Sequence, residues 1–161
     1  MDDNMNYELP IRKSNRLHGY DYSCAGYYFI TICTKDRKHL LSSVGANCVR
    51  PKLSDVGNVI DKEINVLSAT YNNVTVDKYV IMPNHIHIIL TITDCGRTEF
   101  APTIPRIVKQ FKGSITKHIG YPIWQKSYYD QIIRSQADYQ NIWEYIDTNP
   151  AKWEEDEYYC N

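Results

Sequence analysis

The chain has 161 residues, of which 43% are hydrophobic and 23% are charged, and its formal net charge is −1. This length suits one domain with its own hydrophobic core, and the composition is typical of globular rather than disordered or fibrous proteins. No apolar run reaches the roughly 20 residues that a membrane helix needs. The polar start, residues 1–4, does not resemble a secretory signal. We therefore expect a single cytoplasmic domain over residues 1–161 and no membrane partner.

The cysteines argue against a disulfide framework. Their number is odd, their spacing is wide and no Cys-x-x-Cys pair occurs, so a cysteine zinc site is not indicated either. The five are Cys24, Cys33, Cys48, Cys95 and Cys160. We expect free thiols in a reducing compartment.

The small net charge hides an asymmetry along the chain. Residues 137–161 contain seven acidic residues and one basic residue, which leaves 17 basic and 12 acidic residues in the first 136. The larger part is therefore mildly basic, which is compatible with nucleic-acid binding without proving it. We interpret residues 150–161 as a solvated acidic tail.

The first half of the chain predicts one strand, one short hairpin and one helix. Residues 1–25 are polar, and we interpret them as a basic N-terminal arm. Residues 27–34 are rich in aromatic and β-branched side chains, which favours a strand. Residues 39–53 contain short apolar pieces typical of a loose hairpin. Ser54 is a suitable N-cap for a helix over about 55–69, where apolar residues follow helical spacing.

The second half predicts three more strands and a second helix. Strands are expected over 74–81 and 85–92, joined by a tight turn at Met82-Pro83-Asn84, because proline presets a turn dihedral angle. A helix is expected over about 105–119, with Pro105 in its first turn. Residues 128–133 predict a fourth long strand.

A last helix over about 136–148 completes the pattern, with Ser135 as its N-cap and Pro150 at its end. The first six long elements follow the split βαβ order of ferredoxin-like folds. The fold class is therefore α+β, with an antiparallel sheet and two helices on one of its faces. We expect the last helix to cross the other face.

The strand at 85–92 carries the most informative pattern. Its even positions are all apolar: Ile86, Ile88, Leu90 and Ile92. Because side chains alternate between the two faces of a strand, His85 and His87 then project together from the face opposite the apolar one. Both imidazoles can converge on one metal ion there, although a His-x-His pair is often only a polar surface.

The last helix offers a third ligand and a nucleophile. Tyr145 and Asn149 lie one helical turn apart and share one flank. If this helix lies over the histidines, the Asn149 carbonyl oxygen can join them as a metal ligand. Such a set leaves open positions for a hard divalent ion and a phosphate oxygen. The Tyr145 oxygen could attack phosphorus and form a covalent phosphotyrosine. In a chain with 14 tyrosines, simple packing of Tyr145 is the alternative.

The chain resembles the REP-associated tyrosine transposases, a group within the superfamily of His-hydrophobe-His endonucleases. Short stretches carry the resemblance, and their order and spacing make it specific. They are RKSNRLHGYDYSCAGYYFITICT (12–34), VIMPNHIHIIL (80–90), VKQFKGS (108–114), WQ (124–125), YDQIIR (129–134) and YIDTNP (145–150).

The resemblance implies an activity and roles for individual residues. His85 and His87 match the metal pair of the family, Tyr145 its nucleophile and Asn149 its third ligand. Such proteins cleave single-stranded DNA beside hairpins with Mg²⁺ or Mn²⁺, and they leave a 5′-phosphotyrosine and a free 3′-OH. The expected partner is single-stranded hairpin or repeat DNA, bound by a monomer or homodimer associated with the nucleoid.

Six basic residues are candidate DNA contacts: Arg12, Lys13, Arg16, Lys109, Lys112 and Arg134. The first three lie in the N-terminal arm, the two lysines lie on one face of a predicted helix, and Arg134 follows the last strand. A solvated basic surface would explain the same residues.

Two other functions fit parts of the sequence. A ferredoxin-like sheet can bind nucleic acid without catalysis, but such sheets use exposed aromatic residues rather than paired histidines. A zinc hydrolase could use His85, His87 and a carboxylate, but the chain has no His-Glu-x-x-His helix and no acidic residue at an obvious spacing.

Overall fold

The computed structural model describes residues 19–46, 48–93 and 103–160. Its centre is an antiparallel sheet of the strands β1 (Gly26–Cys33), β4 (Val74–Ile81), β5 (His85–Ile92) and β6 (Tyr129–Ile133). Their order across the sheet is β4-β5-β1-β6. All four long strands were predicted, to within a residue at each end.

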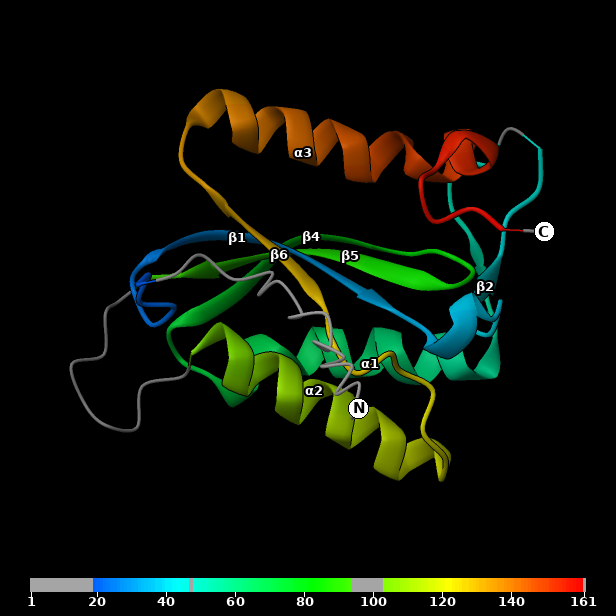
Figure 1. Cartoon of the computed structure of the whole chain (residues 1–161), viewed down its shortest axis with the longest axis horizontal. Helices are drawn as coiled ribbons and strands as arrows, with labels where there is room; N and C mark the ends of the chain where they lie inside the picture. The colour runs from blue at the N-terminus through cyan, green and yellow to red at the C-terminus, as the bar shows by residue number, and fades with distance from the viewer. Residues whose placement is uncertain (1–18, 47, 94–102, 161) are drawn as a thin grey trace, which may run out of the picture.

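The helices lie on both faces of this sheet. Figure 1 shows α1 (Asp55–Thr70) and α2 (Ile104–Ile119) on one face and α3 (Gln136–Thr148) across the other. This confirms the predicted α+β class and the separate position of the last helix. None of the helices in the described part of the chain has the length and apolar character needed to cross a bilayer.

Side-chain caps begin the helices where the sequence predicted them. Ser54 Oγ accepts a hydrogen bond from the Gly57 amide at 3.0 Å, and Ser135 Oγ accepts one from the Asp138 amide at 3.1 Å. Each cap satisfies a backbone donor that has no partner inside the helix. The expected hairpin is also present, as β2 (Ser42–Ser43) paired with β3 (Lys52–Leu53).

Two hydrophobic clusters lie on opposite faces of the sheet. The larger one lies under α1 and α2 and includes the even-numbered residues of β5. The smaller one lies under α3 and contains Phe29, Val80, Met82, Ile89, Ile133, Ile146 and Trp153. His85 and His87 are buried on this second face, which confirms the predicted alternation.

The interpretation of residues 150–161 as a solvated tail was wrong. After α3 the chain continues as a 3-10 helix, η2 (Asn149–Glu155), and Trp153 is buried among the residues under α3. Pro150 does not stop the chain from packing, because a first helical turn needs no amide hydrogen there. The segment after η2 therefore returns to the sheet.

Contacts with β4 fix α3 over the second face. Lys78 forms an ion pair with Asp147, and its ammonium lies 4.8 Å from the centre of the Trp143 ring. Nearer the start of α3, the Tyr139 hydroxyl donates to Asp77 Oδ2 at 2.9 Å. These contacts hold the helix at two separate points along its length.

Two helical glycines predict opposite effects of the same substitution. A Cβ at Gly57 would lie 2.0 Å from the Leu41 carbonyl oxygen, whereas a Cβ at Gly113 would have no neighbour within 4 Å. Gly57→Ala should therefore destabilise the protein by about 1–3 kcal/mol through overpacking. Gly113→Ala should stabilise it by about 0.5–1 kcal/mol, because alanine favours the helix. Urea unfolding measures both, and equal effects would contradict the close approach of α1 to Leu41.

Candidate active site

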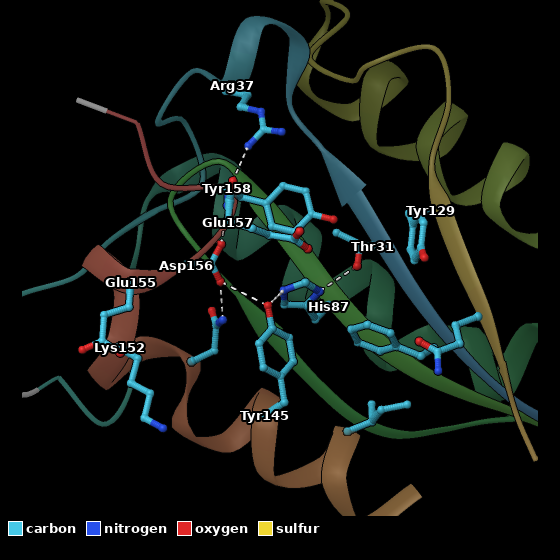
Figure 2. Close-up of a pocket in the computed structure, with 14 residues that line it drawn as sticks. Thr31, Arg37, His87, Tyr129, Tyr145, Lys152, Glu155, Asp156, Glu157 and Tyr158 are labelled. Carbon is cyan, nitrogen blue, oxygen red and sulfur yellow. Dashed lines mark hydrogen bonds between the residues drawn. The ribbon is translucent and has the colours of Figure 1, made fainter. Parts of the chain in front are cut away.

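A cavity of about 750 Å³ lies between the sheet, α3 and the segment that follows η2 (Figure 2). His87 lines its floor, Tyr145 and Asn149 line it from the helical side, and Asp156 lines it from the returning segment. His87, the predicted nucleophile and the predicted third ligand therefore meet in one cavity, and His85 lies beside His87.

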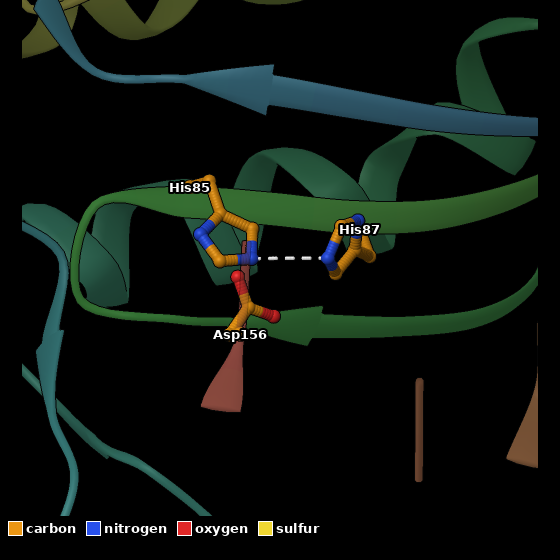
Figure 3. Close-up of side chains that lie close together, drawn as sticks. All are labelled: His85, His87 and Asp156. Atoms are coloured by element: carbon orange, nitrogen blue, oxygen red, sulfur yellow. Dashed lines mark hydrogen bonds between the residues drawn. The ribbon is translucent and has the colours of Figure 1, made fainter. Parts of the chain in front are cut away.

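The Nε2 atoms of the two histidines face each other. The two residues lie opposite Cys33 and Thr31 of β1, near the end of β5 that follows the turn. Their Nε2 atoms are 3.0 Å apart, and Figure 3 shows the two rings converging beside Asp156. Ligands on alternate residues of one strand can reach a single ion in this way.

The other nitrogen of each ring is held by a polar neighbour. Asn84 donates its Nδ2 to the Tyr158 carbonyl oxygen at 2.8 Å, so its Oδ1 is left to accept from His85 Nδ1, also at 2.8 Å. His85 Nδ1 therefore carries the proton and its Nε2 presents a lone pair. His87 Nδ1 lies 2.8 Å from the Thr31 hydroxyl, which can either donate or accept. Such outer contacts orient metal-binding histidines.

Both imidazoles are uncharged at neutral pH. Burial, with a smaller effect from Arg37, lowers the pKa of His85 to about 3. Burial and the neighbouring His85 hold the pKa of His87 well below its ordinary value. A histidine must be deprotonated to bind a metal, so this pair is ready to act as ligands without releasing protons.

Asp156 completes a possible metal site that the sequence analysis did not identify. Its carboxylate and the ring nitrogens of His85 and His87 all lie within 4.8 Å of one another. Asp156 was expected to lie in a solvated tail, so its place in the site was not predicted. Trp153 and Tyr158 were the available signal, because aromatic side chains within an acidic run indicate that the segment packs against something.

Asn149 and Tyr145 both contact this carboxylate. Asn149 is only 3% exposed, and its Nδ2 donates to Asp156 Oδ2. Within the described residues its Oδ1 has no hydrogen-bond partner, as expected of an oxygen that can accept a cation. The Tyr145 hydroxyl lies 3.4 Å from His87 Nε2 and donates to Asp156 Oδ2 at 3.3 Å.

The surroundings of Tyr145 keep its hydroxyl protonated. Burial and then the negative charge of Asp156 raise its pKa above the ordinary value for a tyrosine. A cation between Asp156 and the histidines would offset that charge and favour the phenolate. The arrangement of a tyrosine oxygen beside two uncharged imidazoles and two oxygen ligands suits metal-assisted attack on a phosphate.

The predicted DNA contacts do not gather at this cavity. Lys109 and Lys112 belong to α2, on the opposite face of the sheet, and Lys112 donates to the carbonyl oxygens of Gln125 and Lys126. Arg134 is exposed after β6 and lines a separate cavity. Arg12, Lys13 and Arg16 lie outside the described residues. The cations that do line the site are Arg37 and Lys152.

The buried histidines predict that acid destabilises the protein. Their pKa values are lowered on folding, so below about pH 6.5 the unfolded chain takes up protons that the folded chain does not. The free energy of unfolding should fall by about 1.4 kcal/mol per histidine for each pH unit below that value. Urea unfolding between pH 7 and pH 5, with a chelator present, measures this slope.

Two variants isolate the histidine effect from that of other titrating groups. His87→Gln should reduce the slope of stability against pH, and His85→Gln should do the same, because the glutamine side chain does not titrate. An unchanged slope in His87→Gln would show that His87 is charged in the folded protein.

Comparisons with known proteins agree with the fold and place the chain among its relatives. No family model matches the chain. A Haemophilus influenzae protein of uncharacterized function is 32% identical over 177 residues, and the match covers 97% of each chain. An Escherichia coli REP-associated tyrosine transposase is 28% identical over 132 residues, covering 81% of this chain and 70% of that protein.

The solved structure of a REP-associated tyrosine transposase bound to a REP hairpin has the same fold. It superposes with a TM-score of 0.64 at 22% identity, over 88% of this chain and 74% of that one. The sequence matches along most of the chain, together with this shared fold, lead to one assignment. The chain is a homologue of REP-associated tyrosine transposases and shares their fold.

Proposed function

We propose that the protein is a metal-dependent DNA transposase, an endonuclease and strand transferase that cleaves and rejoins single-stranded DNA near hairpins. The observation that carries the proposal is the position of the Tyr145 hydroxyl, 3.4 Å from His87 Nε2 and beside Asp156. The substrate class comes from the relatives, since one of their structures is bound to a REP hairpin.

Two imidazole nitrogens and at least one oxygen would hold the metal. His85 and His87 supply the nitrogens, and Asn149 Oδ1 or the Asp156 carboxylate supplies the oxygen. Oxygen ligands in this set favour Mg²⁺ or Mn²⁺. When bound, the ion supplies positive charge that orients and polarises the phosphate.

The side chains of the chain then perform the transfer. The Tyr145 oxygen attacks phosphorus, a new O–P bond forms, and the bond from phosphorus to the 3′ oxygen of the preceding nucleotide breaks. Asp156 Oδ2 is the acceptor within reach for the tyrosine proton, and the released 3′ oxygen takes up a proton. The product is a 5′-phosphotyrosine and a free 3′-OH. Because the phosphotyrosine stays activated, a second 3′-OH can reverse the reaction and join to the DNA.

One observation supports a second candidate. The Asp156 carboxylate beside the histidines is the acidic residue that a metal-dependent hydrolase would need as a general base for water. Such an enzyme would leave no covalent adduct and would not need the Tyr145 oxygen. A nucleic-acid-binding domain without catalysis is less well supported, because it does not require buried, uncharged histidines facing a tyrosine hydroxyl.

Metal binding should depend on the histidine pair. Calorimetric titration with Mn²⁺ should show one site in the wild type and at least a tenfold weaker one in His87→Ala, because one of few ligands is lost. Zn²⁺ should bind the wild type more tightly than Mn²⁺, since imidazole affinity rises along that series. His118→Ala is the matched control and should bind Mn²⁺ as the wild type does.

The same titration identifies the oxygen ligand. Asn149→Ala and Asp156→Asn should differ, and the variant with the larger loss of Mn²⁺ affinity marks the residue that contacts the ion. If His87→Ala binds Mn²⁺ as well as the wild type does, the metal site is elsewhere.

Covalent attachment to DNA should depend on the Tyr145 oxygen. Incubation with Mn²⁺ and a labelled single-stranded oligonucleotide carrying a REP hairpin should give an adduct that survives denaturing electrophoresis. Tyr145→Phe keeps the ring and its packing but lacks the attacking oxygen, so it should give no adduct. Tyr121→Phe removes the hydroxyl of an exposed tyrosine outside the cavity and should still give one.

Two results would overturn this assignment. An adduct in Tyr145→Phe would mean that another residue is the nucleophile. Cleavage by the wild type without any adduct would favour the metal-dependent hydrolase and a water nucleophile.

A further inference from the structure

The cavity that holds the site also contains an aromatic residue that the mechanism does not use. Tyr129 of β6 lines this cavity and is 50% exposed. Across the described residues, its ring contacts no other aromatic ring and its hydroxyl has no hydrogen-bond partner. Tyr27, which is 45% exposed, differs because its ring packs edge-on against Tyr139.

The strand register places Tyr129 in line with the metal site. Thr31 lies opposite His87 in the pairing of β1 with β5, and opposite Tyr129 in the pairing of β1 with β6. His87, Thr31 and Tyr129 therefore form one row across three strands, and Figure 2 shows Tyr129 beside Thr31. Neighbouring strands are about 4.8 Å apart, so the backbones of His87 and Tyr129 are separated by about 10 Å.

A second residue of β6, Gln131, places a polar side chain in the same cavity. Gln131 lies opposite Phe29, two residues along β6 from Tyr129, so both side chains point to the face that α3 covers. Gln131 is exposed and lines the cavity, and its amide has no hydrogen-bond partner within the parts of the chain that the structure describes.

A free aromatic face with an amide beside it fits a nucleobase. The ring offers a surface on which a base can stack, and the amide offers one donor and one acceptor to the edge of that base. Neither residue carries the positive charge that attracts a phosphate over a distance. The pair lines the same cavity as His87, next to the place where the phosphate would be held.

We propose that Tyr129 and Gln131 form a binding site for the unpaired nucleobase next to the phosphate that Tyr145 attacks. Tyr129 stacks on the base and Gln131 sets a preference among the four bases. This inference rests on the proposed function, because it places the scissile phosphate at His85 and His87.

The test measures binding separately from chemistry. The probe is a fluorescein-labelled oligonucleotide with a REP hairpin and a single-stranded flank, and the protein carries Tyr145→Phe so that the probe stays intact. Tyr129→Ala should bind this probe roughly 5- to 150-fold more weakly, the range that corresponds to about 1–3 kcal/mol for one stacked base. Tyr129→Phe keeps the ring and should bind normally.

Two further variants control for folding and for general surface effects. Tyr129→Leu keeps apolar bulk on the strand but has no aromatic face, so it should lose affinity as Tyr129→Ala does while keeping the melting temperature. Tyr121→Ala removes a tyrosine of similar exposure, 48%, outside the cavity, and should bind like the parent protein.

An abasic scan identifies the base. An abasic site at one flank position should weaken binding to the Tyr145→Phe protein. The same abasic site should not weaken binding to the double variant Tyr145→Phe with Tyr129→Ala, because the stacking ring is already absent there. Gln131→Leu should reduce the difference in affinity between the four bases at that position. Unchanged affinity in both Tyr129→Ala and Tyr129→Leu, or abasic penalties that persist at every position in Tyr129→Ala, would overturn the inference.

The two proposals fail separately. With Tyr145 intact, loss of the adduct in Tyr129→Phe would mean that the hydroxyl acts in chemistry, which contradicts a stacking role. If the wild type forms no adduct but the abasic coupling holds, the base site stands and the transposase proposal fails. If the adduct forms and Tyr129→Ala changes neither binding nor the abasic penalties, only the base site fails.

Discussion

The packing of α3 against the second face of the sheet is the contact on which the candidate site depends. The helices α1 and α2 cover the first face. The hydrophobic core on that face contains no residue of α3 or η2. The second face carries Phe29, Ile89 and the two histidines, and it is closed by α3 and η2. Contacts to Asp77 and Lys78 of the edge strand β4 fix the helix at two points. These contacts therefore determine the position of Tyr145 over His87.

Charge at the cavity is unusual for a protein expected to bind DNA. Among the described residues, Glu155, Asp156 and Glu157 line it together with two cations, Arg37 and Lys152. A phosphate entering this environment meets acidic groups unless a divalent ion is present to offset them. Metal binding and phosphate binding should therefore reinforce each other. In the proposed base-binding site, uncharged contacts would supply affinity that the few cations described at the cavity do not.

Local physical chemistry explains why so much of the fold could be predicted from the sequence. Alternation in residues 85–92 assigned both histidines to one face, and the caps at Ser54 and Ser135 marked two helix starts. The one-turn spacing of Tyr145 and Asn149 put them on one flank of α3. Each of these inferences depends only on neighbours within a few residues.

The features that were missed depend on contacts between distant parts of the chain. Asp156 reaches the histidines because Trp153 anchors a segment that has no periodic pattern of its own. The hydrogen bonds from the Lys112 ammonium to two carbonyl oxygens before β6 also join distant parts of the chain and could not be predicted from local sequence. The alignment of Tyr129 with His87 depends on the register of three strands, which the sequence of any one of them does not reveal.

The hydroxyl of Thr31 affects which tautomer His87 adopts when no ion is bound. Two imidazole lone pairs 3.0 Å apart would repel each other, yet both rings are buried. Because Thr31 can either donate to His87 Nδ1 or accept from it, His87 can hold its proton on Nε2 and donate to His85, or hold it on Nδ1 and leave Nε2 free. The exchange between these two tautomers needs no change in net charge and no movement of either ring. The same buried pair is thus stable as an internal hydrogen bond and prepared as a pair of ligands.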